Sequence, residues 1–558
     1  MNEFDQTSFL EAFSNATEDQ LADHLDNLVQ LMGERNFCRK AAAQLVLFAK
    51  PEIAVPDSLV HFSPLIRDGI EYFLSGISYR RLRRVLLNQF LLRNKLESAE
   101  RLLNLALHFP TLHKLGQVIA RNPHLNPEVK RWLVGLEQGN YGTDPEVQVR
   151  KIKDQLAKLE SPPDIIISPH IIAEASVATV LLFYYQNLTC GTQREGVFKV
   201  LKPGIEEDLR EELDVLEDTF AFLEQNRSHY GLQEIKLNAI FREISADMAR
   251  EIDLSAEQEH LAEAVQVYKK VAGVRIPRPV PFSTSTMTAM EFIDGMTIAD
   301  IRPTRQQRTT LAKLIFEAIL CVPLFAGKEQ ALFHGDPHAG NILIIKNDDP
   351  DRFDLALLDW TLAAHLSKTQ RVQVMELMLG IMKNDSRTLY EVIESLAVVM
   401  ERDGMNRDHL IERIKKLLAS EEYRCCDLLK RSFLLLETMT LEGVVFPSEL
   451  ILFRKSFFTL EGVINDISTD FAMGRAMELY LSRLLLKEMP QRFGNWINPA
   501  ADKSENYRTL ISNQDLQELS LHRTLAFWRY MMRQSISLIE IQIKLTTDFF
   551  LHFCRGYL

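Results

Sequence analysis

The chain has 558 residues, of which 46% are hydrophobic and 25% are charged, both ordinary fractions for a soluble globular protein. This length suggests two to four packed units. The formal net charge of −12 argues against a nucleic-acid partner, because phosphate backbones bind to basic surfaces. The six cysteines include no CxxC pair, and we interpret them as free thiols of a reducing compartment.

Residues 1–110 are predicted to be helical, because Leu, Ile and Phe recur at steps of three and four between Tyr79 and Leu107. The acidic start Met-Asn-Glu-Phe-Asp does not resemble a signal peptide. Breaks between units are expected at Gly139–Asp144 and at Ser161–Pro163, where glycine and proline gather.

The pattern changes after Ile165 to a mixture of strands and helices, which predicts a small α+β unit. The predicted strands are Val177–Phe183, Gly196–Val200 and Thr286–Phe292, and the predicted helices are Glu206–Glu224 and one near Leu237–Val265. From about Thr297 the chain is predicted to be mainly helical.

The exception is the segment from His334 to Trp360, where strands Asn341–Ile345 and Leu355–Leu358 are predicted to form a hairpin. Beyond His365 the prediction is helical to the end. The stretch Leu525–Phe553 is apolar but interrupted by charges, which predicts an amphipathic helix and not a membrane span. Packing in the core or in a partner groove is favoured there over binding at a membrane surface.

The strongest chemical signal is the segment His334-Gly335-Asp336-Pro337-His338-Ala339-Gly340-Asn341. An Asp and an Asn five positions apart, on a loop that enters a strand, suit phosphoryl transfer. Asp336 can orient or deprotonate the acceptor, and the amide oxygen of Asn341 can bind Mg²⁺. The alternative is a capped turn, since Asp, Pro, Gly and Asn are all turn residues.

Asp359 follows the second strand of the predicted hairpin. A kinase has its metal-binding Asp at this place, and the hairpin returns the chain so that Asn341 and Asp359 can share one Mg²⁺. Taken alone, an Asp after a strand is more often a helix cap.

Lys199 lies on the otherwise apolar strand Gly196–Val200, so its ammonium group needs a partner. ATP phosphates and a helix carboxylate would supply one. Glu257 is the favoured carboxylate, and Glu211 and Glu212 are the competitors.

The segment Met290-Glu291-Phe292-Ile293 is an extended linker that can offer backbone groups to an adenine edge, with Met290 against the base. An ordinary exit from a strand is an equally good interpretation. No G-x-G-x-x-G loop precedes Lys199; its place is taken by Ala173–Val180, including Ala175 and Ser176. Methyl groups limit close approach of this backbone to phosphate, so ordinary protein-kinase chemistry is not expected.

Taken together, these motifs resemble the UbiB/AarF atypical kinase-like family. Its K-x-G-Q motif is similar to Lys114–Gln117, and its E-x-D motif is similar to Glu251–Asp253. Its alanine-rich loop, strand lysine and H-x-D-P-H-P-G-N loop resemble the residues already described, except that Ala339 replaces the usual proline and Thr179 stands where a glutamine is common. This sequence differs from the family pattern at Glu174, which interrupts the alanine-rich loop, and at Thr361, where a glycine usually follows the metal-binding Asp.

The resemblance implies a mostly helical, two-lobe protein-kinase-like fold of α+β class, with ATP and Mg²⁺ as cofactors. Lys114 and Gln117 would then lie over the site and obstruct protein substrates, and Val197, Glu291 and Ile293 would line the nucleotide pocket. The implied units are residues 1–110 (N-terminal helices), 111–160 (K-x-G-Q segment), 161–295 (small lobe), 296–380 (large-lobe core) and 381–558 (helical extension).

The implied activity is an ATPase or small-molecule kinase linked to ubiquinone or another isoprenoid lipid, in a cytoplasmic protein that can be peripheral at the inner membrane face. Two alternatives remain open. One is a phosphotransferase of the aminoglycoside or choline kinase type, which also uses a His-Gly-Asp loop but lacks the K-x-G-Q segment. The other is a nucleotide-sensing scaffold without chemistry.

Overall fold

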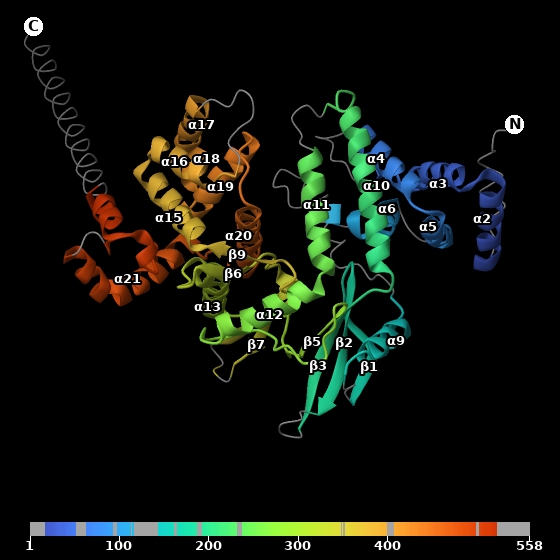
Figure 1. Cartoon of the computed structure of the whole chain (residues 1–558), viewed down its shortest axis with the longest axis horizontal. Coiled ribbons are helices and arrows are strands. Elements are labelled where there is room, and N and C mark those ends of the chain that lie inside the picture. Colours follow the sequence, from blue (N-terminus) through green and yellow to red (C-terminus); the bar gives the residue numbers. More distant parts are fainter. Residues whose placement is uncertain are drawn as a thin grey trace, which may run out of the picture. The chain divides into compact units, whose positions relative to one another are not determined.

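The computed structural model describes residues 17–51, 63–92, 98–112, 114–115, 143–160, 164–186, 192–231, 237–347, 349, 352–398, 407–497 and 501–521. The chain divides into two compact units. The first is Met1–Ala262 with Pro277–Phe292, and the second is Glu263–Ile276 with Ile293–Leu558. The predicted class, α+β and mostly helical, is confirmed (Figure 1).

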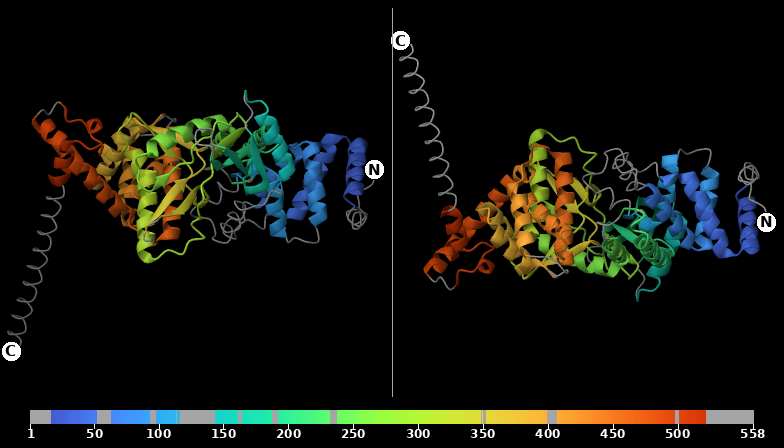
Figure 2. Two further views of the ribbon diagram at one scale, coloured as in Figure 1. Left: turned by 90° about the horizontal axis from the view of Figure 1, so that it is seen from below. Right: turned by 90° about the horizontal axis from the view of Figure 1, so that it is seen from above.

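Helices dominate the beginning of the first unit, and both views of Figure 2 show the first of them, in blue, as one group. Thr17 starts this group with a capping box, because its side chain accepts from the Gln20 amide while the Gln20 side chain accepts from the Thr17 amide. The helices share one hydrophobic core with α10 and α11. They are α2 (Glu18–Met32), α3 (Glu34–Ala49), α4 (Ser63–Gly76), α5 (Tyr79–Leu92), α6 (Ser98–Leu107), α10 (Ile205–Gln225) and α11 (Leu237–Ile252).

A four-stranded antiparallel sheet completes the first unit, in the order β1 (Ile165–Glu174), β2 (Ala178–Gln186), β3 (Gln193–Leu201), β5 (Met287–Glu291). Helix α9 (Pro145–Leu156), capped by the Asp144 side chain, packs on it. Gly196 is required on β3, because a Cβ there would meet the ring of Phe183 at 2.4 Å. The strands predicted around Val177, Gly196 and Thr286 are therefore present, whereas β1 was not predicted as a strand.

The single helix predicted near Leu237–Val265 is wrong, because the structure contains two helices, α11 and α12 (Leu254–Tyr268). Asp253 separates the two helices. Its carboxylate accepts a hydrogen bond from the Ala256 amide at 3.0 Å and so caps α12. As a result Glu257 lies in the first turn of α12, where the helix dipole favours a negative charge.

The second unit contains the predicted hairpin as β7 (Ile342–Lys346) and β8 (Phe353–Leu357), with β4 (Val274–Arg275) parallel to β8. A second, two-stranded sheet, β6 (Gln330–His334) with β9 (Ala363–Ser367), was missed. Short apolar runs such as Ala331–Phe333 cannot be separated from helix by periodicity. The alanines of β9 have little intrinsic preference for strand, so pairing with β6 decides the conformation there.

Helices form the rest of the second unit, as predicted, over the residues that the structure describes. A five-residue π-helical turn, Glu317–Cys321, follows α13. The other helices are α13 (Arg305–Phe316), α14 (Val322–Leu324), α15 (Lys368–Lys383), α16 (Ser386–Leu396), α17 (Arg407–Ala419), α18 (Glu421–Cys425), α19 (Leu428–Leu441), α20 (Ser448–Ile467) and α21 (Met473–Ile497).

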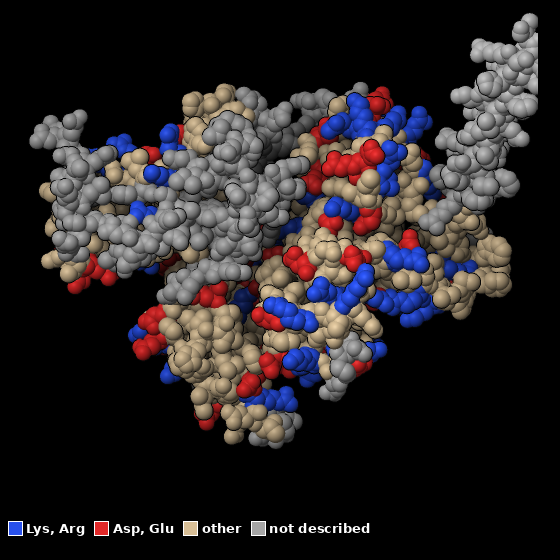
Figure 3. Space-filling view, turned by 180° about the vertical axis from the view of Figure 1, so that it is seen from behind, with Lys and Arg blue, Asp and Glu red and all other residues tan. Residues whose placement is uncertain are grey.

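Several predicted features lie outside the described residues: the break at Ser161–Pro163, most of Gly139–Asp144, and the helix predicted for Leu525–Phe553. Within the described part of the chain, no helix has the length and apolar character needed to span a membrane. On the face shown in Figure 3, Lys and Arg side chains are interspersed with Asp and Glu side chains.

Candidate active site

Lys199 lies at the centre of β3, between Val180 of β2 and Thr288 of β5. It is 8% exposed, and its Nζ atom lies 2.7 Å from Oε1 of Glu257, which is 1% exposed. The hydroxyl of Thr288 donates to the other oxygen of Glu257 at 3.3 Å. A buried lysine is thus held by a buried carboxylate whose orientation is fixed by a second contact.

The two competing carboxylates lie elsewhere. Glu212 is buried against the guanidinium of Arg81 and accepts two hydrogen bonds from Thr111. Glu211 accepts a hydrogen bond from the Ser78 amide at 2.6 Å. Of the three carboxylates that the sequence offered, Glu257 is therefore the one beside Lys199.

The turn between β1 and β2 occupies the place predicted for an alanine-rich loop, but it is shorter. Ala173 and Glu174 belong to β1, and only residues 175–177 form the turn, closed by a hydrogen bond from the Ala175 amide to the Ala178 carbonyl at 2.8 Å. Glu174 forms an ion pair with Lys202 at 3.2 Å and also contacts Thr143. Its charge is therefore compensated within the protein, which reduces its repulsion of a phosphate.

The lysine of the K-x-G-Q motif makes a contact that the sequence did not predict. Lys114 is buried and forms a close ion pair with Glu251, the first residue of the E-x-D motif, and the Ser176 hydroxyl also lies 3.4 Å from Glu251. Glu251 thus links the K-x-G-Q lysine to the β1–β2 turn. Gln117 lies outside the described residues.

The segment predicted to contact adenine begins in the edge strand β5, which contains Met290 and Glu291. Met290 is buried and pairs with Val197 of β3. The Glu291 amide donates to the Arg278 carbonyl, and the Phe292 amide donates to the Glu195 carbonyl. The amides of Glu291 and Phe292 already donate hydrogen bonds within the protein. An adenine ring would therefore have to bind other backbone groups of the segment. Ile293 is buried and belongs to the second unit.

In the second unit, the turn after β6 places Asp336 and Asn341 side by side. The Asn341 side-chain amide donates to the Asp336 carbonyl at 3.1 Å, which leaves its Oδ1 atom as the oxygen that a cation would use. The Leu358 amide donates to the Asn341 carbonyl at 2.9 Å. Asn341 and Asp359 therefore stand at the neighbouring ends of β7 and β8.

Asp359 adopts a left-handed backbone conformation, with φ of 51°, which is uncommon outside glycine, asparagine and aspartate. Its Oδ1 atom accepts hydrogen bonds from the amide and the hydroxyl of Thr361. The indole of Trp360 is buried and donates to the Leu357 carbonyl at 3.3 Å. Thr361 thus fixes the orientation of the carboxylate. An Asp followed two residues later by Thr is the sequence signal for this turn.

Residues 158–393 match the family model of the ABC1 atypical kinase-like domain. This part of the chain is an ABC1 kinase-like domain. The resemblance to the UbiB/AarF family and the kinase-like fold, both inferred from the motifs, are confirmed.

Curated relatives of the ABC1 domain are distant in sequence. A Clostridium pasteurianum protein from the hydrogenase 1 5′ region is 23% identical over 65% of this chain and 66% of its own length. The probable protein kinase UbiB of Xanthomonas campestris is 22% identical over 73% and 74%, respectively. The Arabidopsis thaliana protein ACTIVITY OF BC1 COMPLEX KINASE 1 is 28% identical over 43% of this chain and 34% of its own length. The match thus spans less than two thirds of the Clostridium and Arabidopsis proteins.

Among solved structures, the complex of Rv3197 with erythromycin from Mycobacterium tuberculosis is similar to the chain. It has 16% sequence identity and a TM-score of 0.41, and the match covers 65% of this chain and 90% of that protein.

Oxygen donors in the ABC1 domain suit Mg²⁺. Asn341 and Asp359 offer an amide oxygen and a carboxylate, which are the hard ligands that Mg²⁺ prefers, and Mg²⁺ commonly takes only one or two protein ligands with phosphates and waters. No group of three or more His, Cys, Asp or Glu residues gathers as a metal site in the described part of the chain. Asn341 and Asp359 therefore fit an Mg²⁺ ion that takes its remaining ligands from outside the protein.

His334 supports the turn of Asp336 and Asn341 from inside. It is 1% exposed, its Nε2 atom donates to the Leu358 carbonyl at 2.8 Å, and its Nδ1 atom accepts from the Asp336 amide at 3.3 Å. This pair of contacts needs the neutral ring. Burial lowers the pKa of His334 below its ordinary 6.5.

The protein should consequently lose stability as the pH falls below 6.5. At such a pH His334 binds a proton in the unfolded chain but stays neutral in the folded one. His334→Gln keeps a donor and an acceptor but does not titrate. Between pH 7.5 and 5.5, we expect the thermal midpoint of His334→Gln to fall less than that of the wild type. The corresponding loss of unfolding free energy should be smaller by up to about 1.4 kcal/mol per pH unit. The exposed His338→Gln is the control. Equal pH profiles for the wild type and His334→Gln would exclude this role.

Gly335 is required by a close approach within the ABC1 domain. Its amide donates to the Leu362 carbonyl at 2.6 Å, and a Cβ atom would lie 2.3 Å from that same oxygen. Gly335→Ala should therefore destabilise the second unit by about 2–4 kcal/mol, as a steric clash in a packed interior does.

The control for this substitution is Gly462→Ala in α20, where a Cβ would meet nothing within 4 Å. It should be neutral or stabilise by roughly 0.5–1 kcal/mol, because alanine is the better helix former. Differential scanning calorimetry of both variants measures the contrast. Equal melting temperatures would show that the turn can relax around a methyl group.

Proposed function

We propose that this chain is an atypical kinase or ATPase that binds Mg-ATP and either hydrolyses it or transfers a phosphoryl group to a small-molecule or lipid-linked acceptor. The buried pair of Lys199 and Glu257, 2.7 Å apart, is the observation that carries the proposal. A lysine held in this way on a strand presents a fixed positive charge, which is the arrangement that positions ATP phosphates in kinases.

Each predicted residue has a role in this proposal. Lys199 holds phosphates, Glu257 orients Lys199, and Asp336 positions the nucleophile. Asn341 and Asp359 hold Mg²⁺, which when bound neutralises negative charge on the phosphates. Catalysis rests mainly on positioning and charge neutralisation.

Around the nucleotide, the turn residues Ala175 and Ser176 approach the phosphates, and Val197 and Met290 contact the base. Glu291 and Ile293 contribute backbone groups. Lys114, fixed by Glu251, and Gln117 gate the site against protein substrates. The Lys114–Glu251 pair also favours this proposal over an aminoglycoside or choline kinase, a class that lacks the K-x-G-Q segment.

For the acceptor, we propose a lipid-linked or other small molecule of isoprenoid type. This acceptor class is what the resemblance to the UbiB/AarF family implies. A comparison of ATP turnover with and without a quinone-like phenol tests this part. Turnover that stays at its basal rate with the phenol would point to another acceptor.

One observation favours a second function, a nucleotide-binding scaffold with weak catalysis. Thr361 donates two hydrogen bonds to the Asp359 oxygen, which compete with a metal for that atom. If this contact restrains turnover, Thr361→Gly should raise it. An unchanged or lower rate in Thr361→Gly would exclude the restraint.

Steady-state phosphate release by the purified full chain, measured beside equilibrium ATP binding, separates the two functions. We expect binding together with Mg-dependent release for the enzyme. Binding without release, with and without the phenol, would support the scaffold.

A further inference from the structure

Helix α21 exposes an apolar stripe, which we define as Leu486, Met489, Phe493, Trp496 and Ile497. These side chains recur at steps of three and four, so they share one face of the helix. They are between 56% and 74% exposed. The opposite face of α21 is buried through Met473, Ala476, Met477, Leu484, Glu488 and Arg492. Large apolar faces on soluble proteins mark binding sites, and this one has no cover in the described part of the chain.

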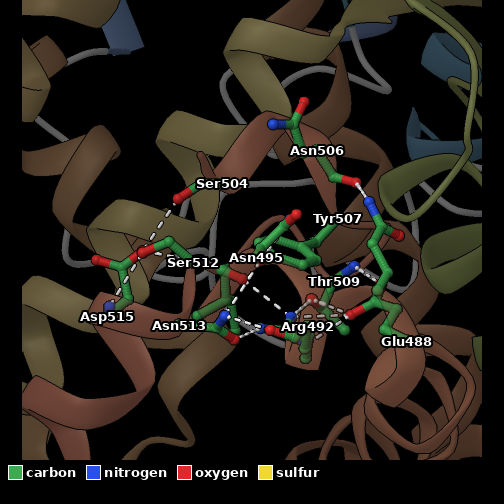
Figure 4. Close-up of polar contacts among 12 residues, drawn as sticks. Glu488, Arg492, Asn495, Ser504, Asn506, Tyr507, Thr509, Ser512, Asn513 and Asp515 are labelled. Carbon is green, nitrogen blue, oxygen red and sulfur yellow. Dashed lines mark hydrogen bonds and ion pairs between the residues drawn. The ribbon is translucent and has the colours of Figure 1, made fainter. Parts of the chain in front are cut away.

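A polar network joins the chain that follows α21 to Glu488 and Arg492, which are buried residues of this helix. Figure 4 shows the residues of this network. Arg492 forms an ion pair with Glu488 at 2.8 Å and stacks over the ring of Tyr507 at 4.0 Å. Glu488 also accepts hydrogen bonds from the amide and the hydroxyl of Thr509. The Asn513 side chain donates to the Arg492 carbonyl at 3.1 Å. Through these contacts, Tyr507, Thr509 and Asn513 attach the chain that follows α21 to its buried side.

The network also fixes where the last segment of the chain begins. Residues 513–521 form one helix that starts at the anchored Asn513. At 1.5 Å per residue, Leu521 lies roughly 12 Å along that helix from the anchor. Leu521 is itself 62% exposed. The segment 522–558 therefore continues from a helix whose first residue is anchored to α21.

The sequence of that segment matches the stripe in character. Its interior charges, Arg529, Arg533, Glu540, Lys544 and Asp548, are spaced by four and seven residues, so a helix would carry them on one side and Leu, Ile, Met and Phe on the other. Such a helix would be roughly 40 Å long, enough to cover the stripe. The segment contains five basic and two acidic residues, a formal charge of +3 against −15 for the rest of the chain.

We propose that the stripe on α21 is the docking site of the C-terminal segment 522–558 of the same chain. Docking covers two apolar faces in one event, and the tether gives the segment an effective concentration of the order of millimolar. The rest of the chain has a net negative charge, which attracts the positively charged segment 522–558. The second unit thus acquires a C-terminal helix that packs along α21.

The test compares exposure on both sides of the contact, in the full chain, at submicromolar concentration and without lipid. Hydroxyl-radical labelling reports on Met489 and Trp496, and tryptic cleavage reports on Arg529 and Arg533. We expect Ile539→Glu/Ile543→Glu to raise labelling of the stripe at least fivefold, and Phe493→Glu to raise cleavage of the segment by a similar factor.

Matched controls are Ser537→Glu on the charged side of the segment and Lys487→Gln, an exposed residue of α21 outside the stripe; both should behave as wild type. Equal labelling and cleavage in the wild type and all variants would overturn the proposal. So would protection that grows with protein concentration, which identifies a second copy. Protection that needs phosphatidylcholine–phosphatidylglycerol vesicles would also overturn it, in favour of a lipid surface.

Discussion

Replacing Asp359 by Asn should lower Mg-dependent ATP turnover by about 10²–10³-fold, the loss that follows when one strong charge-stabilising group is removed from a phosphoryl-transfer site. The substitution removes the negative charge that would bind the cation. It keeps an oxygen that can accept from Thr361, and asparagine tolerates the left-handed backbone found here. Coupled-enzyme kinetics at saturating ATP measure the effect.

A matched control for this variant is Asp354→Asn. Asp354 lies on β8, the strand that precedes Asp359, and its carboxylate accepts from the Asn347 side chain within the hairpin, away from the strand end that Asp359 follows. Its turnover should stay within about twofold of wild type, because Asn can still accept the hydrogen bond from Asn347. Turnover in Asp359→Asn equal to that of the control would remove Asp359 from the metal site.

Replacing both Lys199 and Glu257 should restore the stability that each single replacement loses, but it should not restore ATP binding. Removing one partner of a buried ion pair leaves the other charge uncompensated and costs about 3–5 kcal/mol. Lys199→Met and Glu257→Gln should therefore each lower the melting temperature. The double variant Lys199→Met/Glu257→Gln carries no buried charge at this place and should recover most of the loss.

ATP affinity should not recover with stability. Because Lys199 is proposed to hold the phosphates, the double variant should bind ATP at least tenfold more weakly than wild type although it is folded. Thermal melts and equilibrium titrations on the same preparations separate the two effects. A stable double variant with wild-type ATP affinity would show that the pair is structural only.

The pairing of Lys199 could be predicted because a lysine on an apolar strand needs a partner, and the spacing of Glu251, Asp253 and Glu257 offered one. The break at Asp253 was missed although the apolar periodicity shifts phase there. In one continuous helix, the apolar residues of α11 (Ile244, Met248 and Ile252) and those of α12 (Leu254, Leu261 and Tyr268) would lie on opposite sides. The cap decides it, since the Asp253 side chain competes with the backbone for the Ala256 amide.

Contacts between distant parts of the sequence were the least predictable. Lys114 and Glu251 are 137 residues apart, and neither motif indicates that they form an ion pair. The sheet of β6 and β9 was missed for the same reason, because each strand is short and is stabilised by the other. The hairpin of β7 and β8 was predicted because its two apolar runs and its polar turn are local.

Calorimetric titration of the full chain with ATP, with Mg²⁺ and again with EDTA, tests the central claim most directly. We expect one saturable site whose affinity for ATP falls at least tenfold in EDTA, in Lys199→Met/Glu257→Gln and in Asp359→Asn. Absence of saturable binding would contradict it, as would an affinity that is the same in all four titrations.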